Sequence, residues 1–567
     1  MIQAQTLLIA IVAFQGAISA TAAPEQASSY AGSTTTAVFP PPGVTPGTDD
    51  ALFPPGSVVG YPGPTPTGDE AESLATAPAL SKQESFAPLV EPDPADAHPG
   101  YGGKKIFNIL QNWGALSPWQ SNPADSFGLP DASPLIPKGC SLNQVHLLHR
   151  HGARYPTGDS SVTSFAANIH AVANNGSGFD AMGRLSFLNT WKYKLGAEIL
   201  TPFGRQQLFN LGTGFRVKYG ELLKKFSSLP VFRTTSQGRM LDSALHFAAG
   251  FFGVQSYQSD YHQLITIENN GFNNTLAAWA NCPNANNAVY AYGSTQATKW
   301  SNVYLKNALN RIGALFNSKE YTLRIADLVA MQQLCAYETV ALGYSEFCGL
   351  FTEEEWKGFE YFWDLQFWYS AGPGNPASSA QGIGYVQELL SRLTKTPISD
   401  FNSGVNSSIV TNSKLFPLDQ PIYVDASHDT VISSILTAMN FTSLAATGPL
   451  PTDHMPEPRS YNINQISPFA TNLVGQVLSC PSPSANSSEA THIRWILNDA
   501  VLPLTGVKGC ETNKDGLCEI GTYITGLKQR IAEVDFKYDC FANYTVPEPD
   551  NIVDGRFPVG LRNATSV

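Results

Sequence analysis

The sequence predicts an α/β fold with a helix-rich insertion, and three observations support this prediction. Residues 430–440 place Val, Ile, Leu and Met at helical spacing, directly after a strand-like run. The stretch from about residue 254 to 396 is mostly helical in pattern, for example over 321–342 and 382–393. Strands that lead into helices indicate an α/β core, and the long helical stretch indicates a subdomain inserted in it. Three short strand-like runs each lead into residues that carry chemistry: 144–149, 231–239 and 421–429.

The first 22 residues predict export of the protein. Residues 7–14 form a short apolar run, and small residues ending at Ala22 follow it, as in a cleavable signal peptide. Residues 1–6 lack the usual Lys or Arg, so a buried N-terminal helix is the alternative. The expected location is secreted, extracellular or in the cell wall.

Residues 23–103 predict a disordered linker or stalk. They are rich in Pro, Ser, Thr, Gly and Ala and contain no Cys, Trp or Arg. Such a segment buries too little apolar surface to offset the entropy of folding. A pro-segment that is removed on maturation is the alternative. The folded domain is expected over residues 104–567, with the helix-rich insertion at about 254–396.

Composition disfavours several classes of partner. The chain has 567 residues and a formal net charge of −12, which argues against nucleic acids and anionic membranes. Any anion site is therefore a local basic pocket in an acidic protein. No segment after the N-terminus predicts a membrane span.

The eight cysteines, an even number, predict disulfides formed in an oxidising compartment. No Cys-x-x-Cys pair occurs, so a zinc site is disfavoured, and the sequence alone leaves the connectivity open. Seven Asn-x-Ser/Thr acceptor sites fit an exported glycoprotein: Asn175, Asn273, Asn406, Asn440, Asn486, Asn543 and Asn563.

Residues 150–156 (RHGARYP) are the most informative segment for function. They place two guanidinium groups, from Arg150 and Arg154, around the imidazole of His151. Guanidinium is always charged and pairs with phosphate oxygens, and imidazole can attack phosphorus without a metal. A strand-like run precedes the motif and turn-forming residues follow it. The motif is therefore expected where a strand ends, which is where open α/β sheets bind ligands.

This motif resembles the signature of the histidine acid phosphatases, and its longer form RHGARYPT is similar to the fungal phytase and acid phosphatase branch. The pair His428-Asp429 after a strand and an arginine at a strand end, Arg233, match two further family elements. Satellite stretches such as LTPFG at 200–204 are similar as well, and the resemblance runs from about residue 137 to 542. It implies a phosphoglycerate-mutase-like α/β core with a helix-rich inserted subdomain.

The resemblance also implies a two-step phosphoryl transfer. His151 would attack phosphorus and carry the phosphoryl group as phosphohistidine. Asp429 would protonate the leaving oxygen and then assist water. No metal and no cofactor are implied. Arg239 matches a recurrent arginine of the branch and is assigned to structure. The phosphoryl oxygens are assigned to Arg150, Arg154, Arg233 and His428.

Two further expectations concern the cysteines and histidines. His146, His149 and His151 have a spacing that also suits a metal site. On an extended strand residues 146 and 149 face opposite sides, so we expect His149 in the core and His146 near a loop. The disulfides implied by the resemblance are Cys140–Cys480, Cys282–Cys540, Cys335–Cys348 and Cys510–Cys518.

The predicted function is a secreted acid phosphomonoesterase that hydrolyses phosphate monoesters, including inositol phosphates. Many fungal phytases carry lysines after the first motif and near the GNP segment, where this chain has GDSS at 158–161 and Gln366-Phe367. This departure predicts a broad phosphatase rather than a phytate specialist. The alternatives are a phytate-specific 3-phytase, a mutase, and a non-catalytic secreted glycoprotein that binds phosphorylated ligands. The oligomeric state is left open.

Overall fold

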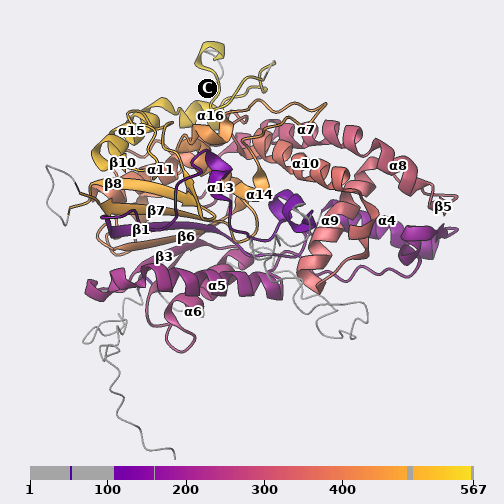
Figure 1. Cartoon of the computed structure of the whole chain (residues 1–567), viewed down its shortest axis with the longest axis horizontal. Helices are drawn as coiled ribbons and strands as arrows, with labels where there is room; N and C mark the ends of the chain where they lie inside the picture. Colours follow the sequence, from indigo (N-terminus) through magenta and orange to yellow (C-terminus); the bar gives the residue numbers. More distant parts are fainter. Residues whose placement is uncertain (1–50, 54–106, 159, 482–488, 549, 563–567) are drawn as a thin grey trace, which may run out of the picture.

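A mixed β-sheet with helices on both faces lies beside a second group of helices (Figure 1). This arrangement confirms the predicted α/β fold. The predicted signal peptide and domain start, and all of the predicted linker except residues 51–53, lie outside the described residues. The computed structural model describes residues 51–53, 107–158, 160–481, 489–548 and 550–562.

Eight strands form the main sheet: β1 (Ser141–Arg150), β3 (Val231–Thr235), β4 (His262–Thr266), β6 (Ile422–Ser427), β7 (Asn472–Ser479), β8 (His492–Leu497), β9 (Ala500–Leu502) and β10 (Cys518–Glu519). Their order is β10-β8-β7-β1-β6-β3-β4, and β9 pairs with β8. The four strands β1, β6, β3 and β4 are parallel to one another, whereas β7 runs antiparallel to β1. Every residue of β3, β6 and β7 is buried, as expected for strands covered on both faces.

Helices cover the two faces of this sheet. On one face α5 (Pro202–Tyr219) and α6 (Gly238–Phe252) pack against each other. On the other face α11 (Ser378–Thr394) lies between α13 (Asp429–Ala438) and α15 (Ile520–Glu533) (Figure 1). The short α16 (Phe536–Phe541) packs on α11 near the C-terminus.

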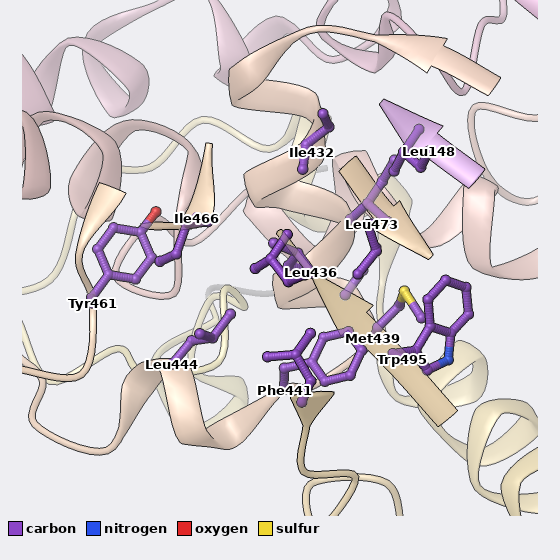
Figure 2. Packing of buried hydrophobic residues seen from close by; sticks show 14 of the residues in the cluster. Leu148, Ile432, Leu436, Met439, Phe441, Leu444, Tyr461, Ile466, Leu473 and Trp495 are labelled. Atoms are coloured by element: carbon purple, nitrogen blue, oxygen red, sulfur yellow. The ribbon is translucent and has the colours of Figure 1, made fainter. Parts of the chain in front are cut away.

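The core beneath α13 fixes the helix whose first residue is Asp429. Ile432 and Leu436 of α13 belong to one buried cluster with Leu148 of β1 and Leu473 of β7 (Figure 2). All four side chains are at most 1% exposed. Full burial of such a side chain stabilises the fold by about 1.5–3 kcal/mol. The start of α13 is therefore held firmly against the end of β1.

The second group of helices comprises α4 (Ser161–Asn175), α7 (Ala288–Tyr304), α8 (Lys306–Gly313), α9 (Ile325–Leu342) and α10 (Glu353–Ala371). A two-stranded sheet of β2 (Phe179–Ala181) and β5 (Phe316–Ser318) lies at its outer end (Figure 1). At the start of α10, the Thr352 and Glu355 side chains bond reciprocally to each other's backbone N–H in a capping box. The short helices α12 (Ser407–Val410) and α14 (Ile463–Ile466) lie in connecting segments.

The helices expected over 321–342, 382–393 and 430–440 correspond to α9, α11 and α13. The segment 254–396 is less uniform than its pattern predicts. It also contains β4, a strand of the main sheet, and α11, which packs on α13. Conversely, α4 precedes this segment and packs on α9. The helical group thus contains helices that precede β3 in the sequence and helices that follow it.

The four disulfides are Cys140–Cys480, Cys282–Cys540, Cys335–Cys348 and Cys510–Cys518, which confirms the expected pairing. The first two close long stretches of chain and so restrict the unfolded state most. Of the helices in the described residues, none has the length and apolar character needed to cross a bilayer.

Candidate active site

The candidate site lies where four parallel strands end at the same edge of the sheet. His151 follows β1, His428 and Asp429 follow β6, and Glu268 follows β4. Arg239 is the second residue of α6, which follows β3. Because Arg150 of β1 is in register with Ser427 of β6, the residues after them emerge side by side. Such carboxyl ends of strands are the usual ligand sites of open α/β sheets.

His151 is 1% exposed, and its Nδ1 lies 2.8 Å from the carbonyl oxygen of Gly152. Because a carbonyl only accepts, Nδ1 carries the proton and the lone pair is on Nε2. Burial lowers the pKa of His151 well below its usual value, and the nearby Arg150, Arg239 and Arg154 lower it further. The imidazole is therefore neutral, and able to act as a nucleophile, even in acid.

Close backbone contact explains two glycines around the motif. A Cβ on Gly152 would collide with the carbonyl oxygen of Gly204, and one on Gly204 would collide with that of Ala153. Thr201 caps α5 by accepting from the Gly204 N–H, and its hydroxyl also donates to the Ala153 carbonyl. The RHGARYP and LTPFG segments thus pack closely against each other through their backbones, and this packing sets the position of His151.

Arg150 is fully buried and held from three sides. Its Nη1 donates to the carbonyl oxygens of Ala115 at 2.5 Å and Ser467 at 2.8 Å. Its Nη2 donates to Oδ2 of Asp429 at 2.5 Å, and its guanidinium lies 4.5 Å from the ring centre of Phe469. These contacts fix the guanidinium in one orientation beside His151.

Arg154 and Arg239 complete a cluster of three guanidinium groups. Arg154 donates to the Tyr337 hydroxyl at 3.3 Å, and Arg239 donates to Glu198 at 2.8 Å. Burial, followed by the charge of Arg154, lowers the pKa of Arg239 to about 10. In the described part of the chain, the Nε–H donors of Arg150, Arg154 and Arg239 are buried and have no hydrogen-bond partner. Buried unsatisfied donors on crowded cations are what a bound anion would satisfy.

The structure does not bring Arg233 to this cluster. Its Nε lies 2.6 Å from Asp425 and its Nη2 lies 2.8 Å from Glu388. Arg392 binds the same Asp425 at 2.6 Å, so all four charges form a buried network. Asp425 is in register with Leu148, three residues before His151, which is about 10 Å along a strand.

The two arginines thus exchange their expected positions. Arg239, which was expected to be structural, lies in the arginine cluster. Arg233, which was expected to bind phosphoryl oxygens, lies in the buried ion-pair network. Both residues belong to the same segment, VFRTTSQGR. The useful signal is that Arg239 comes after the strand, as His151 and Asp429 do, whereas Arg233 is inside it.

Asp429 is the first residue of α13, and its Oδ1 accepts from the Thr430 N–H at 2.8 Å. Burial tends to raise its pKa, but Arg150 and Arg154 outweigh this effect, and the pKa is lowered. These two arginines thus favour the ionised form of the Asp429 carboxyl group. The rings of His151 and His428 lie edge to face with centres 5.9 Å apart.

Glu268 is a member of the site that the sequence did not predict. Its Oε1 lies 2.7 Å from Nε2 of His428, and both side chains are less than a tenth exposed. It comes two residues after β4, a strand of only five residues, HQLIT, that carries little sequence pattern to mark it.

His146 and His149 are both fully buried within β1, so the expected position of His146 near a loop is wrong. Burial lowers the pKa of His146 to about 3 and that of His149 to about 4. Their rings stack on Tyr423 and Phe247, respectively. Across the described residues, no three His, Cys, Asp or Glu side chains are grouped so as to hold a metal ion. Independence from metal and cofactor remains a prediction.

The place where many fungal phytases carry lysines holds no cation here. Gln366 donates to the hydroxyls of Ser294 and Ser370, and Phe367 is buried in the core. Lys192 and Lys194 are exposed.

Comparison with known proteins agrees with this geometry. Residues 141–498 match the family model of the histidine phosphatase superfamily, branch 2. Phytase A of Aspergillus fumigatus is 33% identical over 433 residues, which cover 73% of this chain and 87% of that protein. Phytase A of Aspergillus oryzae is 31% identical over 451 residues, which cover 75% of this chain and 90% of that protein. The crystal structure of the phytase from D. castellii matches with a TM-score of 0.61 and 26% identity, covering 79% of this chain and 90% of that one. The chain therefore belongs to the histidine phosphatase superfamily, branch 2.

Proposed function

We propose that this protein is an acid phosphomonoesterase that works through a phosphohistidine intermediate without a metal. The observation that carries the proposal is the state of His151. It is a neutral imidazole with its lone pair on Nε2, beside three guanidinium groups whose Nε–H donors have no partner among the described residues. A phosphoryl group supplies the negative oxygens that these donors need and the electrophile that Nε2 needs.

In the first step, Nε2 of His151 forms a bond to phosphorus and the bond from phosphorus to the ester oxygen breaks. Arg150, Arg154 and Arg239 hold the phosphoryl oxygens and stabilise the charge that develops on them. Asp429 gives its proton to the leaving oxygen, so that an alcohol departs. When phosphate is bound, Arg150 interacts with the phosphate as well as with Asp429. Arg150 then stabilises the ionised form of Asp429 less.

In the second step, water attacks the phosphohistidine. Asp429, now a carboxylate, takes a proton from the water as the new oxygen–phosphorus bond forms. The bond from phosphorus to Nε2 breaks, and inorganic phosphate leaves with His151 and Asp429 restored.

The proposed substrates are phosphate monoesters, including inositol phosphates. Two curated relatives bear the name phytase A, which supports the inclusion of inositol phosphates. The neutral Gln366 and buried Phe367 favour a broad range over phytate specificity. A phytate-specific enzyme is the second candidate, favoured by the names of the relatives. Secretion is proposed as well, because four disulfides suit an oxidising compartment.

The test is the release of phosphate from p-nitrophenyl phosphate at acid pH by the purified protein and by His151→Ala. We expect the variant to keep at most a few per cent of the activity, because a nucleophile has no substitute in a two-step transfer. His454→Ala is the control, since His454 is exposed and its ring pairs with the adjacent, exposed Asp453. An active His151→Ala protein, or an inactive natural one, would overturn the proposal.

A further inference from the structure

The buried carboxylate of Glu268 contacts His428, and it follows β4, whereas the proposed nucleophile His151 follows β1 on the other side of β6 in the sheet. Glu268 Oε1 is 2.7 Å from Nε2 of His428, with side-chain exposures of 5% and 8%. These residues follow β4 and β6, which are separated in the sheet by β3. A pair buried to this degree is shielded from solvent, so its interaction is far stronger than that of a surface pair.

Several groups hold Glu268 in this position. The Thr235 hydroxyl donates to the same Oε1, and the Glu268 N–H donates to Oγ of Ser236 at 2.9 Å. The positive charge of Arg239 also acts on the carboxylate. Burial tends to raise the pKa of Glu268, but His428, Thr235 and Arg239 outweigh it, and the pKa is lowered. An ionised carboxylate only accepts, so Nε2 of His428 is the donor.

We propose that Glu268 is a positioning residue whose charged carboxylate accepts from Nε2 of His428 and so holds the ring with Nδ1 as a donor to an oxygen of the transferred phosphoryl group. The inference rests on the proposed phosphatase function. With one proton on Nε2, a neutral His428 would turn the lone pair of Nδ1 toward the phosphoryl oxygens and repel them. The second proton changes Nδ1 into a charged donor.

The charges around His428 explain why a carboxylate is needed there. His428 faces Glu268 after β4, Asp429 at the start of α13 and His151 after β1, and Arg239 of α6 faces Glu268. Asp429 is already paired with Arg150 at 2.5 Å. Among the described residues, Glu268 is the carboxylate that pairs with the His428 ring, and its negative charge opposes the positive charge of the nearby Arg239.

The variant Glu268→Gln tests this role, because the amide has nearly the same shape and its oxygen still accepts from Nε2, but the charge is gone. We expect kcat/KM for p-nitrophenyl phosphate to fall roughly 10- to 100-fold, as for other carboxylate partners of functional histidines. Inhibition by orthovanadate should weaken as well.

Glu355→Gln is the matched control. Glu355 is buried to a similar degree and pairs with Arg311 in the helical group, away from the site. We expect it to lower the stability without weakening inhibition by orthovanadate. Glu268→Asp keeps the charge but shortens its reach, so kcat/KM should fall in this variant as well.

A Glu268→Gln protein with natural kcat/KM and natural orthovanadate inhibition would overturn the inference, whatever its stability. If the amide variant does not fold, Glu268→Asp decides, and natural kcat/KM in that variant would overturn it. Failure of the proposed function looks different, because the natural protein itself would then release no phosphate and bind no orthovanadate.

Discussion

Substitution of Arg233 and of Arg239 by Met should separate a structural arginine from a catalytic one. Arg233→Met removes the ion pair of the buried Glu388 and leaves the buried Asp425 paired with Arg392. Removing one partner of a buried charge pair typically costs about 3–5 kcal/mol of the free energy of unfolding. Methionine fills a volume close to that of the aliphatic part of arginine. The loss of unfolding free energy therefore reflects removal of the charge rather than creation of a cavity.

Arg239→Met should instead act on the reaction. It leaves Glu198 without its ion pair, but these two side chains are each 11% exposed, so water compensates in part. Loss of one donor to a developing phosphoryl charge costs roughly 10²- to 10³-fold in kcat. By the relation of 1.36 kcal/mol to each factor of ten, this loss is about 2.7–4 kcal/mol of transition-state stabilisation.

Two measurements on each variant distinguish these effects: urea unfolding, and kcat/KM for p-nitrophenyl phosphate at acid pH. Stabilisation by added inorganic phosphate is a third, since a ligand of the folded state raises its stability according to occupancy. Arg233→Met should keep this phosphate effect and Arg239→Met should lose most of it. The reverse pattern, a stable but inactive Arg233→Met protein and a nearly natural Arg239→Met protein, would refute the assignment.

Three further outcomes are expected. Asp429→Asn should impair hydrolysis of glycerol phosphate more than that of p-nitrophenyl phosphate, because an amide cannot protonate a poor leaving group; equal losses would contradict the acid role. EDTA should leave activity intact whereas orthovanadate inhibits, and activity restored by zinc after chelation would contradict a metal-free mechanism. His149 has its pKa lowered to about 4, so acid favours the unfolded state, which binds the proton from about pH 6.5 downward. His149→Leu should therefore shrink the stability difference between pH 6.5 and pH 4 by about 3 kcal/mol, as judged by urea unfolding, and an unchanged difference would contradict this.

Much of the site is predictable because its chemistry is contiguous in the sequence. Arg150, His151 and Arg154 lie in one loop, and His428 and Asp429 are adjacent, so strand-end placement follows from the local pattern alone. The fold class follows from the same alternation of strands and helices.

The remaining residues depend on facts that a single sequence does not contain. The choice between Arg233 and Arg239 depends on where β3 ends, and a strand's length is set by its pairing with β4 and β6. Glu268 becomes part of the site only because β4 joins the sheet next to β3. His146 is buried because β1 is covered on both faces. The alternation of side chains along a strand by itself suggests that one face is exposed to solvent.

The proposed mechanism predicts an acid optimum, because the same arginines affect the two proposed reacting groups differently. They hold the pKa of His151 down, so acid does not protonate the nucleophile. They also hold the pKa of Asp429 down, so the acid needed for the leaving group is scarce until the pH falls or a phosphate occupies Arg150. Lowering the pH therefore supplies the proton donor without removing the nucleophile. As the pH rises, Asp429 in the substrate complex gives up its proton. We therefore expect the fall of kcat at higher pH to follow the ionisation of Asp429 rather than that of His151.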